Sequence, residues 1–129
     1  METERDLSNH RLTQAEQCLK DAKSLYAENS YKGAVNRAYY CVFHSIRSIL
    51  ALMRVDFKSH KAIMSYFREH YIKTGVLDTR LSRILGDLFL ARTESDYDDF
   101  YTIEKEETAK QIENAELFME QVKAYLERQ

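Results

Sequence analysis

Residues 31–53 read YKGAVNRAYYCVFHSIRSILALM, and this stretch decides the fold because its apolar residues lie on more than one side of a helix. Apolar residues on one face mark a surface helix, whereas apolar residues around most of the circumference mark a buried one. The apolar positions that recur at helical spacing are Ala34, Val35, Ala38, Tyr39, Val42, Ile46, Ile49, Leu50 and Met53. The stretch is therefore predicted to be the most buried helix of the protein, beginning near Tyr31.

The rest of the chain is also predicted to be helical. It has no proline and only three glycines in 129 residues, and both residue types disfavour helix interiors. Helical periodicity appears at residues 6–28, 77–91 and 112–126, a shorter helix is expected after the N-cap candidate Ser59, and the polar residues 93–102 are predicted to be a loop. We therefore predict an all-α single domain over residues 1–129, an antiparallel four-helix bundle with an extra short helix.

A homodimer is expected from the same stretch. Residues 31–53 carry apolar side chains on more faces than a four-helix protomer is expected to cover. A second copy related by a two-fold axis would bury the remainder.

Composition and charge narrow the function classes. No apolar run reaches the roughly 20 residues that span a bilayer. The N-terminal METERDLSNHRL lacks the apolar stretch of a signal peptide, so we expect a cytoplasmic protein that does not enter a membrane.

Cys18 and Cys41 are isolated at apolar helical positions and are predicted to be reduced thiols. No zinc-type Cys/His spacing and no Gly-rich phosphate loop occurs, so neither a metal nor a cofactor is predicted.

The charges are unevenly distributed. Residues 54–83 hold seven Lys or Arg against three Asp or Glu, whereas residues 93–129 hold four against eleven. A modest basic segment can attract phosphates, but a mixed solvated surface has the same composition.

Polar side chains interrupt the buried helix on one side. Arg37, Tyr40 and His44 are three and four residues apart and share a helix face, which Arg47 extends. One interpretation is structural: a salt-bridged arginine, a half-buried tyrosine and a satisfied histidine. The other is a phosphate-binding cleft, because a guanidinium can hold a phosphate in bidentate fashion and is costly to bury without a partner.

A second polar cluster, LARTESDYDDFY, occupies residues 90–101. If the preceding helix continued, Arg92 and Asp96 would pair at i, i+4. The acidic run of this cluster is otherwise predicted to be a solvated loop, and the sequence does not indicate a role for the wider acidic segment 94–107. It lacks the glycine and the distal glutamate of a calcium loop, so no metal is predicted here.

Three motifs together resemble the HEPN domain superfamily. They are YKGAVNRAYYCVFHSI at 31–46, SHK at 59–61 and LARTESDY at 90–97, and the resemblance extends from about residue 10 to residue 125. It implies a helical bundle that pairs into a homodimer, with a site in the cleft between protomers. Many HEPN members are metal-independent ribonucleases, and several are toxins whose antitoxin is a small nucleotidyltransferase. RNA or a nucleotide is therefore the implied ligand.

The resemblance also implies site residues. Arg92 matches the catalytic arginine of the family motif, in which a histidine follows four to six residues later. This chain has Tyr97 five residues after Arg92, so His44 on another helix becomes the candidate proton carrier. The residues expected to bind the phosphate or nucleotide are Arg37, Tyr40, His60, Asp96 and Tyr97.

Three functions remain open at this point. The first is binding of a nucleotide or RNA without cleavage, as the toxin-side partner of a nucleotidyltransferase antitoxin. The second is a metal-independent ribonuclease with a rearranged site, in which Arg92 and Arg37 hold the phosphate and His44 moves a proton near neutral pH. The third is a non-catalytic interaction module in which the polar cluster is structural.

Overall fold

The first two helices form an antiparallel pair because the chain reverses within three residues. The computed structural model describes residues 3–129, in which α1 spans Glu4–Ala27 and α2 spans Tyr31–Leu52. Between them Asn29 adopts a positive φ of 64°, in the left-handed region that asparagine tolerates better than most residues. The remaining helices are α3 (His60–Phe67), the π-helix η1 (Arg68–Ile72), α4 (Arg80–Tyr97) and α5 (Lys105–Glu127).

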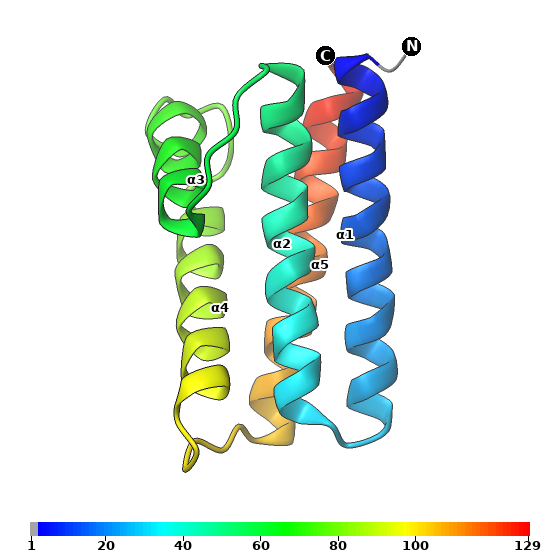
Figure 1. The fold of residues 1–129 in the computed structure, drawn as a ribbon, viewed down its shortest axis with the longest axis vertical. Coiled ribbons are helices and arrows are strands. Elements are labelled where there is room, and N and C mark those ends of the chain that lie inside the picture. The colour runs from blue at the N-terminus through cyan, green and yellow to red at the C-terminus, as the bar shows by residue number, and fades with distance from the viewer. Residues whose placement is uncertain (1–2) are drawn as a thin grey trace.

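The long helices α1, α2, α4 and α5 form the bundle, and the short α3 lies beside the first turns of α4 (Figure 1). No strand occurs in residues 3–129, so the prediction of an all-α four-helix bundle with one extra short helix is confirmed. Within the same residues, none of the helices is both long and apolar enough to cross a bilayer.

The helix α2 is the most buried of the bundle, as its sequence predicts. Between residues 34 and 51 every position is buried except five, and all five are polar. We call these residues the polar stripe: Asn36, Arg37, Tyr40, His44 and Arg47. The core around α2 is made by α1, α4 and α5, which cover its apolar faces.

This burial removes the reason for which a homodimer was expected. The apolar side chains of α2 between residues 34 and 51, including Val42, Ile46 and Leu50, are buried within the protomer itself. The short α3 contributes Ile63 and Phe67 to the same core, which the pattern in α2 alone does not indicate. The apolar residues between 34 and 51 therefore need no second copy to cover them, and the homodimer stays a prediction that rests on the family resemblance.

The short helix begins where the sequence predicts. The Ser59 hydroxyl accepts a hydrogen bond from the backbone N–H of Ala62 at 3.0 Å, which caps α3. The chain continues through the π-helix η1 and turns at Gly75, whose φ of 80° suits a residue without a Cβ. The π-helix itself has no signature in the sequence.

The helix α4 continues farther than predicted. Residues 93–97 belong to it, so the expectation of a loop from 93 to 102 is wrong in its first half. Polar contacts extend the helix: Arg92 pairs with Asp96 at 3.0 Å, and the Thr93 hydroxyl donates to the carbonyl of Phe89 at 2.8 Å. A helical period in the sequence arises from a buried face, and residues 92–97 are only half-buried or exposed, so the sequence shows no such period here.

Candidate functional site

The polar stripe contacts both helices that flank α2. In Figure 1, α2 lies between α1 and α4. Toward α1, the Arg37 guanidinium lies 4.0 Å from the Cys18 sulfur. Its Nε and Nη2 donate to the Asn36 side-chain oxygen at 3.0 and 2.7 Å. Arg37 is therefore held by neutral groups and forms no ion pair with a carboxylate of residues 3–129.

From the other side, α4 brings Arg92 to the same point. Its Nη2 donates to the Tyr40 hydroxyl at 3.1 Å, and its Nε lies 3.0 Å from Asp96. Both guanidinium carbons lie near the Tyr40 ring, Arg37 at 5.0 Å and Arg92 at 5.6 Å from its centre. An aromatic face attracts cations at this range, so Tyr40 can hold two arginines together.

The Arg92–Asp96 pair is close but not aligned as a hydrogen bond. The Nε atom of Arg92 is buried and has no properly oriented acceptor within residues 3–129, although Asp96 is near. The two side chains are 18% and 31% exposed. Asp96 therefore compensates part of the charge of Arg92 and leaves hydrogen-bonding capacity unused.

His60 joins the site through Tyr39. The Tyr39 hydroxyl lies 2.8 Å from Nδ1 of His60, and the imidazole stacks on Phe43 with ring centres 4.0 Å apart. Burial raises the pKa of Tyr39, which keeps the hydroxyl protonated. Burial, with Arg92 and Arg47 nearby, lowers the pKa of His60, so this imidazole is neutral at pH 7.

His44 is half-buried among cationic side chains. Burial is the main cause that lowers its pKa to about 4, and the charges of Arg47, Arg37, Arg11 and His60 add to it. Its Nδ1 is buried without a hydrogen-bond partner in the described part of the chain. A histidine with this pKa is neutral at pH 7 and a weak base, so the arrangement does not favour proton transfer by His44, and its catalytic role stays a prediction.

Beyond His44 the stripe ends in a shared ion pair. Asp56 lies 3.3 Å from Arg47 and 3.6 Å from Arg11 of α1. Arg11 is itself buried and donates to the carbonyl of Arg47 at 3.0 Å. Two arginines thus share one carboxylate, so this end also carries excess positive charge.

We call the residues that surround Tyr40 the Tyr40 cluster: Arg37, Tyr39, Tyr40, His44, His60, Arg92 and Asp96. Six of the seven predicted site residues belong to it. Tyr97 does not, because its side chain is 77% exposed at the end of α4 and makes none of these contacts.

Sequence reasoning missed two participants. Tyr39 looked like a core residue, and only the fold shows its hydroxyl on His60. Arg11 is separated from Ser8 and Ala15 by three and four residues, and both of these are buried. That spacing on the buried face of α1 was a usable signal. No group of three or more His, Cys, Asp or Glu in residues 3–129 is arranged to hold a metal ion.

Comparisons with known proteins agree on one family. The HEPN domain profile matches residues 8–125. The chain is 30% identical over 115 residues to a Methanocaldococcus jannaschii protein named "Putative toxin MJ0142", covering 89% of this chain and 78% of that one. A second protein of that organism, "Putative toxin MJ0605", is 31% identical over 87% of this chain and 83% of its own. A Thermotoga maritima "UPF0332 protein" is 29% identical over 88% and 86%.

Proposed function

The chain belongs to the HEPN domain family, and on that premise we propose that it is the toxin-side member of a toxin–antitoxin pair that binds a nucleotide or RNA phosphate at the Tyr40 cluster. The family membership and the names of its relatives support the toxin role. In this proposal the partner is a nucleotidyltransferase antitoxin, and the protein acts in the cytoplasm as a homodimer.

One observation carries the binding proposal: two arginines from different helices converge on Tyr40 with a single carboxylate beside them. Arg37 has only neutral partners, and Arg92 has Asp96. Burial is the main cause of the lowered pKa of His44, and the part that Arg47 and Arg37 add to it is a second sign of the same positive potential. A phosphate would supply the negative charge that this cluster lacks.

A bound phosphate would also change the two histidines. A negative charge beside an imidazole favours its protonated form, so it would raise the pKa of His44 and His60. Binding should therefore take up protons and should strengthen as the pH falls. This pH dependence distinguishes a phosphate bound in the Tyr40 cluster from a phosphate bound elsewhere on the exposed surface.

The competing function is RNA cleavage without a metal. The neutral His44 would have to accept the proton of a 2′-hydroxyl, and with a pKa of about 4 it is a weak base for that step. Binding without cleavage is therefore the function that this site supports best. Incubation of RNA with the protein in EDTA distinguishes binding from cleavage. Cleavage by the wild type that disappears in His44→Ala would favour the ribonuclease function.

The direct test measures affinity for a short RNA and for ATP by fluorescence anisotropy or calorimetry. Arg37→Ala and Arg92→Ala should each weaken binding about ten- to a hundredfold, since a charge-assisted contact contributes roughly 1.5–3 kcal/mol. Lys110→Ala removes the same charge from an exposed site on α5 and is the matched control. Equal losses in all three variants, or no binding by the wild type to either ligand, would leave the cluster with a structural role.

A further inference from the structure

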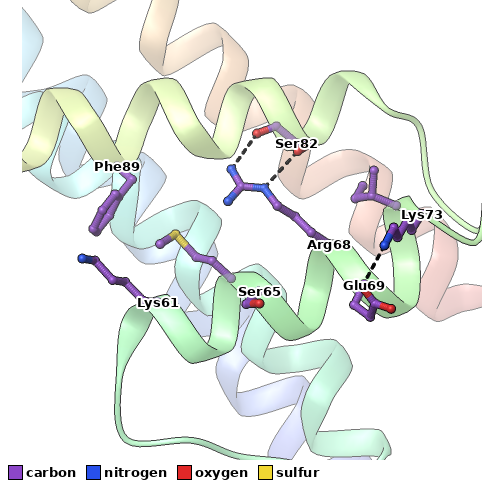
Figure 2. A pocket seen from close by; sticks show the side chains of 9 residues that line it. Lys61, Ser65, Arg68, Glu69, Lys73, Ser82 and Phe89 are labelled. Atoms are coloured by element: carbon purple, nitrogen blue, oxygen red, sulfur yellow. Dashed lines mark hydrogen bonds and ion pairs between the residues drawn. The ribbon is translucent and has the colours of Figure 1, made fainter.

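A groove of about 580 Å³ lies on the side of the molecule where α3 and η1 meet α4 (Figure 2). Its apolar lining comes from Met64, Ile72 and Phe89. Its charged lining has three cations, Lys61, Arg68 and Lys73, against the single carboxylate of Glu69. None of the residues that line the groove belongs to the Tyr40 cluster, although Phe89 contacts the ring of Tyr39 and Lys61 follows His60 in the chain.

The cationic lining is partly fixed in place. Arg68 donates to the Ser82 hydroxyl at 2.9 Å and to the Ser82 carbonyl at 3.0 Å, which ties η1 to α4. Gly86 permits this approach, since a Cβ there would lie 3.3 Å from the guanidinium. Lys73 pairs with Glu69 at 3.4 Å. Figure 2 shows Lys61 beside Phe89 at one end and Ser82, Lys73 and Glu69 toward the other.

Exposed apolar residues lie on the solvent-facing side of α4 and past its end. Leu90 is 58% exposed and Tyr97 is 77% exposed. Residues seven apart return to the same side of a helix, so these two form one row, which lies about 100° around α4 from the row of Ser82 and Phe89. Phe100 follows in the connecting segment and is 92% exposed. With Asp98 and Asp99, residues 97–101 form an acidic segment with two exposed rings, those of Tyr97 and Phe100.

We propose that the groove of one copy binds segment 97–101 of a second copy, with the two α4 helices antiparallel about a two-fold axis. This goes beyond the homodimer expected of the family, because it names the surface and makes the groove incomplete without the partner's residues. It does not depend on phosphate binding at the Tyr40 cluster.

The register of such a pair follows from α4 alone. A two-fold axis across antiparallel helices makes each contact reciprocal. If Tyr97 of each copy lies level with Ser82 of the other along the helix axis, Leu90 lies level with Phe89, next to the two-fold axis. Ser82 and Tyr97 are about 22 Å apart along α4, so segment 97–101 lies far from the Ser82 end of its own groove.

The chemistry of the two surfaces is complementary. Asp98 and Asp99 would meet Arg68 and Lys73 at the Ser82 end of the groove. The ring of Phe100, now almost wholly in water, would pack on the apolar lining. Burying an exposed aromatic ring supplies affinity, and opposite charges fix the orientation.

A photo-crosslinking experiment tests the contact directly. p-Benzoylphenylalanine in place of Phe100 should yield, on irradiation, a species of twice the 15.3 kDa chain mass. In a mixture of isotope-labelled and unlabelled protein, mass spectrometry should find mixed cross-links into residues 61–73. A purely monomeric protein, or cross-links to any other region, would overturn the proposal.

A charge exchange is the second test. Lys73→Glu and Asp99→Lys should each raise the dimer dissociation constant at least tenfold in sedimentation experiments, and the double variant should recover the wild-type value. Both positions are exposed, and circular dichroism verifies that the helices persist. Lys110→Glu on α5 is the control. Single variants that dimerise like the wild type, or a double variant that does not recover, would contradict the proposed contact.

Discussion

The helices α2 and α4 use apolar residues in opposite ways. The sequence of α2 is the more apolar, yet the protomer covers all of its apolar side chains between residues 34 and 51 and leaves only the polar stripe outside. The sequence of α4 is more polar, yet it leaves Leu90 and Tyr97 in water. The helix with more apolar residues is thus not the helix with free apolar surface.

The difference arises from the number of neighbours. α2 packs against α1, α4 and α5 and touches α3, whereas α4 stands at the edge of the bundle (Figure 1). An apolar residue on a central helix strengthens the core, and the same residue on an edge helix is available to a partner. The apolar surface that stays exposed after folding, and not the number of apolar residues in the sequence, therefore indicates where an interface can form.

The largest test of this contrast places the same charge on each helix. Val42→Asp buries a carboxylate among apolar side chains and should lower the free energy of unfolding by about 4 kcal/mol or more. Leu90→Asp should change it by no more than about 0.5 kcal/mol in the protomer, because that position is exposed. Urea denaturation at concentrations that keep the protein monomeric measures both.

The same pair of variants separates folding from association. Leu90→Asp should remain folded and dimerise less strongly, since Leu90 lies near the proposed two-fold axis. If Leu90→Asp unfolds the protomer as Val42→Asp does, α4 is not the free edge described above.

The second test uses the histidine of the polar stripe. His44 has a pKa of about 4 in the folded protein against 6.5 when exposed, because it is partly buried and faces Arg47, Arg37, Arg11 and His60. Between these values the unfolded chain binds the proton and the folded protein does not. Stability should therefore fall as the pH is lowered from about 6.5 toward 4.

His44→Gln should flatten this decline, which thermal unfolding at a series of pH values measures. His60 has a lowered pKa too, so part of the slope should remain in that variant. His10→Gln, on the exposed surface of α1, is the control and should leave the profile unchanged. A wild-type stability that stays constant from pH 6.5 to 4 would contradict the burial of His44.

How much of this was accessible from sequence depends on the kind of signal. The core helices were predictable because buried helix faces place apolar residues such as Val42 and Leu50 at helical spacing in the sequence. The meeting of Arg37, Tyr40 and Arg92 was predictable only through the resemblance to HEPN domains, because residues 52 positions apart along the chain carry no common period. The pKa of His44, the hydroxyl of Tyr39 on His60 and the groove beside α4 depend on packing and could not be read from the chain.

A third, smaller effect distinguishes the two tyrosines assigned to the site. Tyr40→Phe removes the hydroxyl that accepts from Arg92, and the loss should lower stability by about 1 kcal/mol. Tyr97→Phe should leave stability unchanged, because that ring is exposed and outside the Tyr40 cluster. Denaturation midpoints of the two variants, measured side by side, make the comparison. Equal effects would mean that Tyr97 contacts the cluster after all.

The smallest effect is expected from Asp96, and it shows how α4 contributes to the site of α2. The Arg92–Asp96 pair is an i, i+4 contact between partly exposed side chains, so Asp96→Asn should cost only a few tenths of a kcal/mol in stability. The same change leaves Arg92 without its carboxylate and makes the Tyr40 cluster more positive. Affinity for a phosphate ligand should therefore stay the same or increase, whereas Arg92→Ala lowers it. If Asp96→Asn weakens binding as much as Arg92→Ala does, Asp96 positions the arginine for the ligand, and its role is more than charge compensation.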